Sequence, residues 1–293
     1  GDDAAIWEAP QATLVSTTDT MVDGVHFNSL NVSWEDIGWK VMAVNLSDVA
    51  SMGAIPLGAL VTLGIPSSAL ISSVDELYSG ILESCHAFGT LVVGGDIVNS
   101  EDWFITVALN GACQGIPLMR NAARPGDLIG VTGYLGGSAA GLRLLLEESS
   151  HNGEAKRRLI SLHNRPHPKL AEGIHLNNSG VRCAMDVSDG LLADLRKLCN
   201  ESRVSANVRM AAVPVNPDTL EIFTETAGEL ALSGGEDYEL IFTGQGNLIK
   251  QMAADLSGYI IGEITNDENG QVNVLDNDGR HMDFPDSGWE HLT

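Results

Sequence analysis

Residues 40–54 read Lys-Val-Met-Ala-Val-Asn-Leu-Ser-Asp-Val-Ala-Ser-Met-Gly-Ala, an apolar stretch that carries one polar motif, Asn45-Leu46-Ser47-Asp48. Shortly before it, Ser33-Trp34-Glu35-Asp36 has the pattern of a capping box, which predicts that a helix begins there. Four side chains at helical spacing then share one face: Ile37, Val41, Val44 and Asp48. The sequence thus predicts a helix that presents an aspartate beside a row of apolar side chains.

Outward from this helix, strand-like apolar runs alternate with helical patterns, which predicts an α/β protein with mixed sheets. We expect strands around residues 13–18, 90–93, 103–109, 128–132, 183–187, 205–210, 238–243, 259–264 and 271–275. Further helices are expected around 75–88, 137–149, 168–178, 190–201 and 247–257. The turn-rich segment 120–127 is typical of a boundary, and a chain of 293 residues exceeds the usual size of one domain. We therefore predict two domains, residues 1–120 and 121–293.

The charge of the chain argues against two classes of partner. Its 39 acidic and 16 basic residues give a formal net charge of -23, which repels nucleic-acid phosphates and anionic lipids. No apolar run is long enough to span a bilayer. We therefore expect neither nucleic acid nor a membrane as a partner.

The cysteines and the first residues bear on where the protein works. The cysteines are widely spaced and form no C-x-x-C pair: Cys85, Cys113, Cys183 and Cys199. This spacing is typical of buried thiols in a reducing compartment, so we predict a cytoplasmic protein. The sequence opens on Gly1-Asp2-Asp3 without a methionine or an apolar leader, and we expect that a first segment is missing.

Five short motifs place an aspartate beside glycine, serine or threonine: Gly1-Asp2-Asp3, Ser16-Thr17-Thr18-Asp19-Thr20, Asn45-Leu46-Ser47-Asp48, Gly94-Gly95-Asp96 and Asp186-Val187-Ser188-Asp189-Gly190. Taken singly, each is better explained as a helix cap. However, Asp19, Asp96 and Asp186 each fall at or just past an expected strand, where strand ends converge. Carboxylate oxygens there suit Mg²⁺. Because the sequence has no phosphate-loop lysine, several ions would be needed to neutralise a bound nucleotide.

Two glycine-rich turns remain to be interpreted. Ser233-Gly-Gly-Glu-Asp-Tyr-Glu-Leu240 places Glu236 and Asp237 directly before an expected strand. Buried acids are costly unless they are paired or liganded, so we interpret this loop as functional rather than as a hairpin turn. The other turn, residues 133–138, opens an expected helix, where an anion site and a purely structural turn both stay possible.

Taken together, these motifs resemble the thiamine-monophosphate kinase family of the AIR-synthase-like superfamily. N-L-S-D-x-A-x-M-G-A and G-G-D recur across that superfamily, whereas S-T-T-D-T followed by His26 and S-G-G-E-D-Y-E-L are specific to the thiamine enzymes. The order and spacing of the motifs match over essentially the whole chain. The sequence begins at the first aspartate motif, so the helical segment that precedes it in the family is absent.

The resemblance implies a two-domain AIR-synthase-like fold in which strands of the N-terminal domain pair across a homodimer. It implies catalytic roles for Asp96, Asp186 and Asp189. It implies magnesium ligands at Asp3, Thr17, Thr18, Asp19, Asp48, Asp96, Asp186 and Asp189. It implies nucleotide contacts at Tyr78, Gly95, Asp96, Arg120 and Ser188. Thiamine phosphate contacts would fall on His26, Glu236 and Trp289, although by themselves His26 is better explained as a hydrogen-bonded polar residue and Trp289 as a core residue.

The implied reaction is magnesium-assisted, in-line transfer of the γ-phosphoryl group of ATP to thiamine monophosphate, which yields thiamine diphosphate. The nearest alternatives are other enzymes of the superfamily: selenophosphate synthetase, AIR synthase and the hydrogenase maturation enzyme. Selenophosphate synthetase is expected to carry a reactive cysteine near its N-terminus, and the first residues of this sequence have none. An alternative from another class is a non-catalytic protein that binds metal or nucleotide on the same scaffold.

Overall fold

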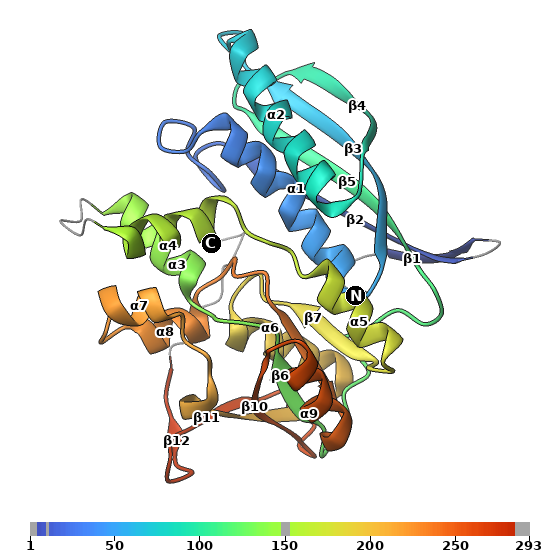
Figure 1. Cartoon of the computed structure of the whole chain (residues 1–293), viewed down its shortest axis with the longest axis vertical. Helices are drawn as coiled ribbons and strands as arrows, with labels where there is room; N and C mark the ends of the chain where they lie inside the picture. Colours follow the sequence, from blue (N-terminus) through green and yellow to red (C-terminus); the bar gives the residue numbers. More distant parts are fainter. Residues whose placement is uncertain (1–4, 10–11, 148–152, 285–293) are drawn as a thin grey trace.

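Two mixed β-sheets, one from each half of the chain, form the framework of the structure (Figure 1). The structure is a computed structural model that describes residues 5–9, 12–147 and 153–284, with side chains from residue 13 onward. Asp3 and Trp289, two of the predicted site residues, lie outside the described residues.

The first sheet comes from the N-terminal half. Within the described residues its strands are β1 (Ala5–Ala9), β2 (Ala12–Val22), β3 (Ile55–Ile65), β4 (Val92–Asn99) and β5 (Phe104–Cys113). Their order is β1-β2-β5-β3-β4, with β3 and β4 parallel and the other neighbours antiparallel. This arrangement makes β4 an edge strand, and it is exposed over most of its length.

The second sheet comes from the C-terminal half. In the part of the chain that is described, its strands are β6 (Leu128–Val131), β7 (Cys183–Asp186), β8 (Ser205–Arg209), β9 (Leu240–Gly244), β10 (Tyr259–Thr265), β11 (Val272–Leu275) and β12 (His281–Met282). Their order is β12-β11-β8-β10-β6-β9-β7, with β8 and β11 parallel. The short edge strand β7 therefore places Asp186, its last residue, at one side of this sheet.

Helices cover both sheets. Those of the N-terminal half are α1 (Trp34–Ser51) and α2 (Ile71–Phe88). Those of the C-terminal half are α3 (Gly137–Leu146), α4 (Glu154–Asn164), α5 (Leu170–Asn178), α6 (Leu191–Ser202), α7 (Pro217–Ile222), α8 (Ala227–Ser233) and α9 (Gly246–Asp255), with a 3-10 turn at Met210–Ala212. No helix in the described ranges is long and apolar enough to cross a membrane.

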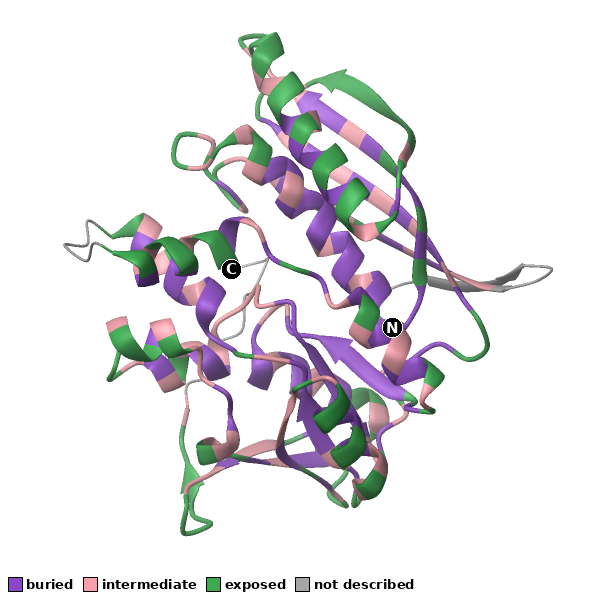
Figure 2. Cartoon of the chain, viewed as in Figure 1, coloured by how far each residue is buried: buried purple, intermediate pink, exposed green. Residues whose placement is uncertain are grey.

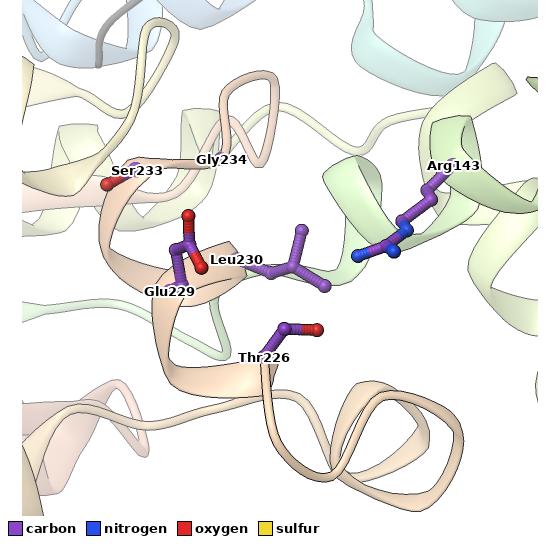
Figure 3. Close-up of a pocket in the computed structure, with 6 residues that line it drawn as sticks. All are labelled: Arg143, Thr226, Glu229, Leu230, Ser233 and Gly234. Atoms are coloured by element: carbon purple, nitrogen blue, oxygen red, sulfur yellow. The ribbon is translucent and has the colours of Figure 1, made fainter. Parts of the chain in front are cut away.

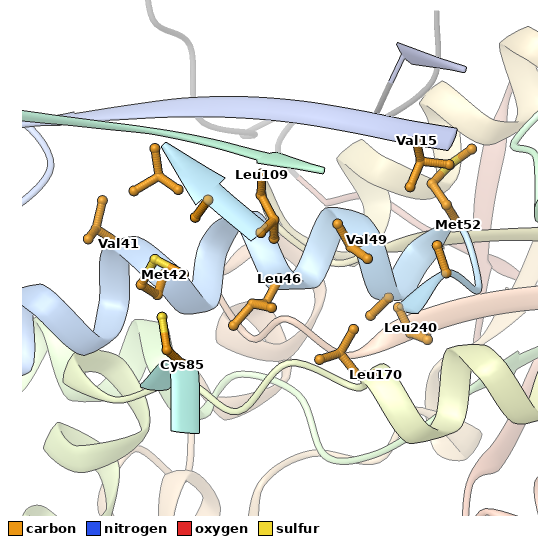
Figure 4. Close-up of a cluster of buried hydrophobic side chains, with 14 of the residues drawn as sticks. Val15, Val41, Met42, Leu46, Val49, Met52, Cys85, Leu109, Leu170 and Leu240 are labelled. Carbon is orange, nitrogen blue, oxygen red and sulfur yellow. The ribbon is translucent and has the colours of Figure 1, made fainter. Parts of the chain in front are cut away.

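Helix α1 lies between the two sheets and is buried along most of its length (Figure 2). On one side it packs against the first sheet at Val15 and Leu109, and on the other it meets Leu170 and Leu240 from the C-terminal half (Figure 4). Burial on both sides removes more apolar surface from water than a helix on one sheet could. The face that the sequence predicted, with Ile37, Val41 and Val44 beside Asp48, was therefore too narrow.

The two N-terminal helices contact each other through their backbones. A Cβ atom at Gly38 of α1 would lie 2.0 Å from the carbonyl oxygen of Leu77, and one at Gly80 of α2 would lie 1.8 Å from that of Glu35. Only glycine allows this approach. The close approach of the two backbones holds α2 against α1.

The local predictions are confirmed for most elements. Ser33 caps α1 by accepting the backbone N–H of Asp36 at 3.1 Å, and Gly89 ends α2 in the left-handed region with φ 70°. Among the described helices and strands, the sequence analysis missed β1, β3, β12, α4, α7 and α8. The four cysteines, all described, are buried and form no disulfide.

Because α1 is packed between the two sheets, truncation of a buried side chain on it should greatly lower the free energy of unfolding. Leu46→Ala should lower the free energy of unfolding by about 2–5 kcal/mol, because Leu46 is fully buried between the sheets. Leu146→Ala is the control: Leu146 is 69% exposed, so its loss should change stability by no more than about 0.5 kcal/mol. Denaturant unfolding of both variants measures the difference, and equal effects would contradict the central role of α1.

Candidate active site

Three of the predicted aspartates lie around residues 45–48, near the C-terminal end of α1: Asp19 from β2, Asp48 from α1 itself and Asp186 from the end of β7. Thr17 Oγ1 donates a hydrogen bond to Asp48, and the backbone N–H of Asp19 donates to Asn45 Oδ1 at 3.1 Å. On the opposite side of the helix, Ser47 Oγ donates to Asp186 Oδ2 at 2.6 Å. One turn of α1 thus fixes carboxylates from both halves of the chain.

The electrostatics of these carboxylates show how close they are. Burial raises the pKa of Asp186 to about 7; Ser47 and Arg120 oppose the rise, and the charges of Asp194 and Asp19 add to it. Burial also raises the pKa of Asp48 well above its usual range, and repulsion from Asp186 and Asp19 raises it further. Mutually repelling carboxylate oxygens are the donor set that a divalent cation would stabilise.

Within the described residues, the predicted metal ligands do not form a complete coordination site. No group of three or more histidine, cysteine, aspartate or glutamate side chains there is arranged to hold a metal ion. The three aspartates therefore share an electrostatic neighbourhood without standing at ligand spacing, and Asp3 is not described.

A buried residue that the sequence analysis missed, Asp194 in the first turn of α6, holds the loop after Asp186. Its Oδ2 accepts the backbone N–H groups of Ser188 at 2.9 Å, Asp189 at 2.8 Å and Gly190 at 3.1 Å. Lys197, one turn later, pairs with Asp189 and with Asp194 Oδ1. An acidic residue in the first turn of a helix was the available signal.

Asp96 lies apart from this group, because the register places it on the opposite face of the first sheet. Asp96 is aligned with Thr62, Thr62 with Thr106, and Thr106 with Thr20. Neighbours along a strand point to opposite faces, so Asp19 faces away from Asp96. Both residues also lie inside strands, and the expectation that they stand at strand ends was wrong; only Asp186 does.

The predicted nucleotide contacts fall in two places. Tyr78, Gly95 and Asp96 line an open pocket of about 530 Å³ on β4 and α2. Arg120 and Ser188 lie instead near Asp186: Arg120 acts on the Asp186 charge, and Ser188 belongs to the loop that follows it. Within one chain, these residues do not form a single pocket.

The three acidic side chains of the loop before β9 each have a different partner. Glu236 pairs with Lys40 of α1 at 2.9 Å, and Glu239 pairs with Lys169 at 3.0 Å. Asp237 accepts the backbone N–H groups of Gly136 at 2.7 Å and Ser138 at 3.1 Å. The N-terminus of α3, where an anion site was one possibility, is therefore occupied by the protein's own carboxylate.

His26 lies within electrostatic reach of Glu236. Its Nδ1 accepts the backbone N–H of Val22 at 3.1 Å, which assigns the proton to Nε2. Burial opposes ionisation of Glu236, but Lys40, His163 and His26 together lower its pKa below the usual range. The structure therefore brings together two of the three predicted thiamine phosphate contacts, His26 and Glu236.

A smaller pocket lies between α3 and α8 (Figure 3). Its volume is about 180 Å³, and its lining comprises Arg143, Thr226, Glu229, Leu230, Ser233 and Gly234. None of these is a predicted site residue, and Arg143 pairs with Glu147 on the surface. The carboxylates around α1 remain the stronger candidate.

Comparisons with known proteins identify the family to which this fold belongs. The family model "AIR synthase related protein, N-terminal domain" matches residues 1–116, and that of the C-terminal domain matches residues 124–275. Thiamine-monophosphate kinase of Bacillus subtilis (strain 168) is 36% identical over an alignment of 303 positions, which includes 100% of this chain and 92% of that protein. Thiamine-monophosphate kinase of Aquifex aeolicus (strain VF5) is 38% identical over 247 residues. The alignment covers 83% of this chain and 79% of the Aquifex protein.

Solved structures show the same likeness. The structure described as AaThiL complexed with AMPPCP and TMP superposes with a TM-score of 0.90 and 34% identity, over 99% of this chain and 91% of that one. The hydrogenase maturation protein HypE in complex with ATP is 18% identical at a TM-score of 0.76, so it shows a shared fold alone. With the motifs, the fold and the full-length similarity in agreement, the chain belongs to the thiamine-monophosphate kinase family and has its two-domain AIR-synthase-like fold.

Proposed function

We propose that this protein phosphorylates thiamine monophosphate with ATP, in the cytoplasm, to give thiamine diphosphate and ADP. The observation that carries the proposal is the similarity, over 99% of the chain, to a structure described as complexed with AMPPCP and TMP, a pair that matches an ATP analogue and thiamine monophosphate. Identity to thiamine-monophosphate kinases reaches 38%, against 18% to HypE bound to ATP. The thiamine substrate is therefore favoured over those of the other enzymes on this fold.

The acceptor needs little activation. The second pKa of a phosphate monoester is about 6, so near neutral pH its oxygen is already deprotonated and no general base is required. This oxygen forms a bond to the γ-phosphorus as the bond from that phosphorus to the β-phosphate oxygen breaks, and ADP leaves. The main barrier is the repulsion between two anions.

The residues around α1 have the donor chemistry of a magnesium site, although those that the structure describes do not stand at ligand spacing. Asp19, Asp48 and Asp186 offer hard oxygen donors whose burial and mutual repulsion favour a cation. When bound, Mg²⁺ supplies positive charge that offsets the charge of the phosphates. We propose the remaining ligands as Asp3, Thr17, Thr18, Asp96 and Asp189, with Asp96, Asp186 and Asp189 acting in catalysis.

The remaining contacts divide between the two substrates. We propose that Tyr78, Gly95, Asp96, Arg120 and Ser188 bind ATP. His26, Glu236 and Trp289 would bind thiamine monophosphate; what supports the pairing of the first two is that His26 helps to lower the pKa of Glu236. We also retain a division of the chain near residue 120, in the connection between β5 and β6.

A homodimer is the proposed assembly, with the first sheet as its interface. The edge strand β4 and its neighbour β3 expose a group of large apolar side chains: Leu57, Leu60, Val93, Ile97 and Val98. An uncovered edge with apolar side chains is a surface for pairing with another strand. A second copy of the chain would cover it and could bring its own Asp96 pocket near the partner's carboxylates.

Removal of a carboxylate from the α1 group should separate activity from stability. Asp186→Asn should reduce turnover about a hundredfold or more, because the charge that attracts the cation is lost. Its melting temperature should stay equal or rise, since Asp186 is only 2% exposed and a buried charge is removed. Asp278→Asn, on an exposed hairpin, is the control and should alter neither. Near-normal turnover of Asp186→Asn would refute the magnesium assignment.

Loss of charge at Glu236 should act on the acceptor rather than on ATP. Glu236→Gln should raise the KM for thiamine monophosphate by about tenfold, as expected for a charge-assisted hydrogen bond, and leave the KM for ATP nearly unchanged. Steady-state kinetics with each substrate varied in turn measure this. An unchanged KM for thiamine monophosphate would remove Glu236 from the acceptor site.

If the first sheet is the dimer interface, a charged residue introduced on its exposed face should weaken dimerisation. Leu60→Asp places a charge on a residue that is 45% exposed and should shift the protein toward monomer, as measured by light scattering over a range of concentrations. Leu146→Asp, at a more exposed position on α3, should leave the mass unchanged. A monomeric wild-type protein, or a Leu60→Asp variant that still dimerises normally, would contradict the proposed interface.

A further inference from the structure

Lys40 of α1 is a buried cation that links the two halves of the chain. Its side chain is 5% exposed, and its Nζ lies 2.9 Å from Glu236 Oε2, 196 residues later in the sequence. A lysine is rarely buried this far unless its charge is paired. The pair therefore fixes the Glu236 loop to the central helix.

His163 of α4 completes the arrangement, and its tautomer follows from its neighbours. Lys40 Nζ lies 3.3 Å from His163 Nε2, and because an ammonium group only donates, Nε2 accepts. The ring proton is therefore on Nδ1, which donates to Ser138 Oγ at 3.0 Å and lies 3.3 Å from Glu236 Oε2. Burial lowers the pKa of His163 to about 4, which agrees with a neutral ring.

Both contacts fall on the same oxygen of Glu236. Lys40 and His163 approach Oε2, whereas Oε1 accepts no hydrogen bond from any residue that the structure describes. The Glu236 side chain is 32% exposed, so its second oxygen can reach a ligand. Oε2 of Glu236 is therefore held by the protein, and Oε1 is available to accept a hydrogen bond from a ligand.

The backbone of Glu236 is also constrained. Its φ of 64° lies in the left-handed region, which is unfavourable for a residue other than glycine, and Tyr238 shares this conformation with φ 51°. The Glu236 N–H donates to Ser188 O at 2.8 Å, in the loop that follows Asp186. Contacts from three sides thus determine the direction of one carboxylate.

We propose that Lys40 and His163 are positioning residues for the acceptor site: they hold Oε2 of Glu236 and so direct Oε1 toward an N–H donor on the rings of thiamine monophosphate. This inference rests on the proposed function, and it concerns residues that the motifs did not single out. Lys40 acts through Glu236 rather than by touching the substrate.

A double-mutant cycle between Lys40 and Glu236 tests this directly, with thiamine monophosphate titrated calorimetrically in the absence of ATP. Lys40→Met and Glu236→Gln should each weaken binding by about tenfold, as for loss of a charge-assisted hydrogen bond. The double variant should bind no more weakly than Glu236→Gln alone, because Lys40 has no effect once its partner is neutral. Additive losses would overturn the proposal, since they would mean that Lys40 acts independently of Glu236.

Kinetics supply the readout that a general structural defect would not give. The KM for thiamine monophosphate should rise in Lys40→Met while that for ATP stays within about twofold, and Lys40→Arg, which keeps the charge, should restore part of the loss. An equal rise in both KM values would count against positioning. Lys169→Met is the matched control, since Lys169 pairs with Glu239 of the same loop, and it should change neither KM.

Two further outcomes are distinguishable. Lys40→Met removes the cation that pairs with Glu236 inside the protein, and this variant can fail to fold. In that case the comparison of Glu236→Gln with the double variant decides alone: equal affinities support the proposal and unequal affinities overturn it. A wild-type protein that neither binds nor phosphorylates thiamine monophosphate would refute the proposed function and this inference together, whereas an active wild type with an additive cycle would refute only the inference.

Discussion

Helix α1 must pack against two sheets at once, and the positions of most of the site residues follow from that constraint. Because both of its sides are buried, its polar residues have to find partners inside the protein: Asn45 holds β2, Ser47 holds the end of β7, and Asp48 receives Thr17. The same hydrogen bonds that make the helix compatible with burial also align strands from both halves. Packing and site geometry therefore have a common origin in one turn of helix.

The carboxylates around α1 are unfavourable to the fold by themselves. Asp48 and Asp186 resist ionisation because water is excluded and like charges are near. The structure contains local compensation, such as Lys197 beside Asp189 and Asp194, but this lies on the outer side of the loop. A cation bound to these oxygens would therefore also stabilise the folded chain, since it would relieve a cost of folding.

The sequence was most informative where a local pattern determines local structure. Ser33 begins α1 and Gly89 ends α2, as predicted, and the family motifs led to the correct fold. Strand β3 was missed because Pro56, Gly58 and Gly64 interrupt its pattern. The pairing of Lys40 with Glu236 could not be predicted, since residues 196 apart are joined only by the tertiary fold. The separation of Asp19 from Asp96 likewise depends on register, which the motifs do not specify.

The carboxylate of Asp237 at the start of α3 determines what that helix end can bind. Helix N-termini are the usual places where proteins acquire phosphate binding, and the glycine-rich turn of residues 133–138 has the shape for it. Here an internal side chain fills that position and makes two of its hydrogen bonds. Any other anion would have to displace this carboxylate before it could bind at the start of α3.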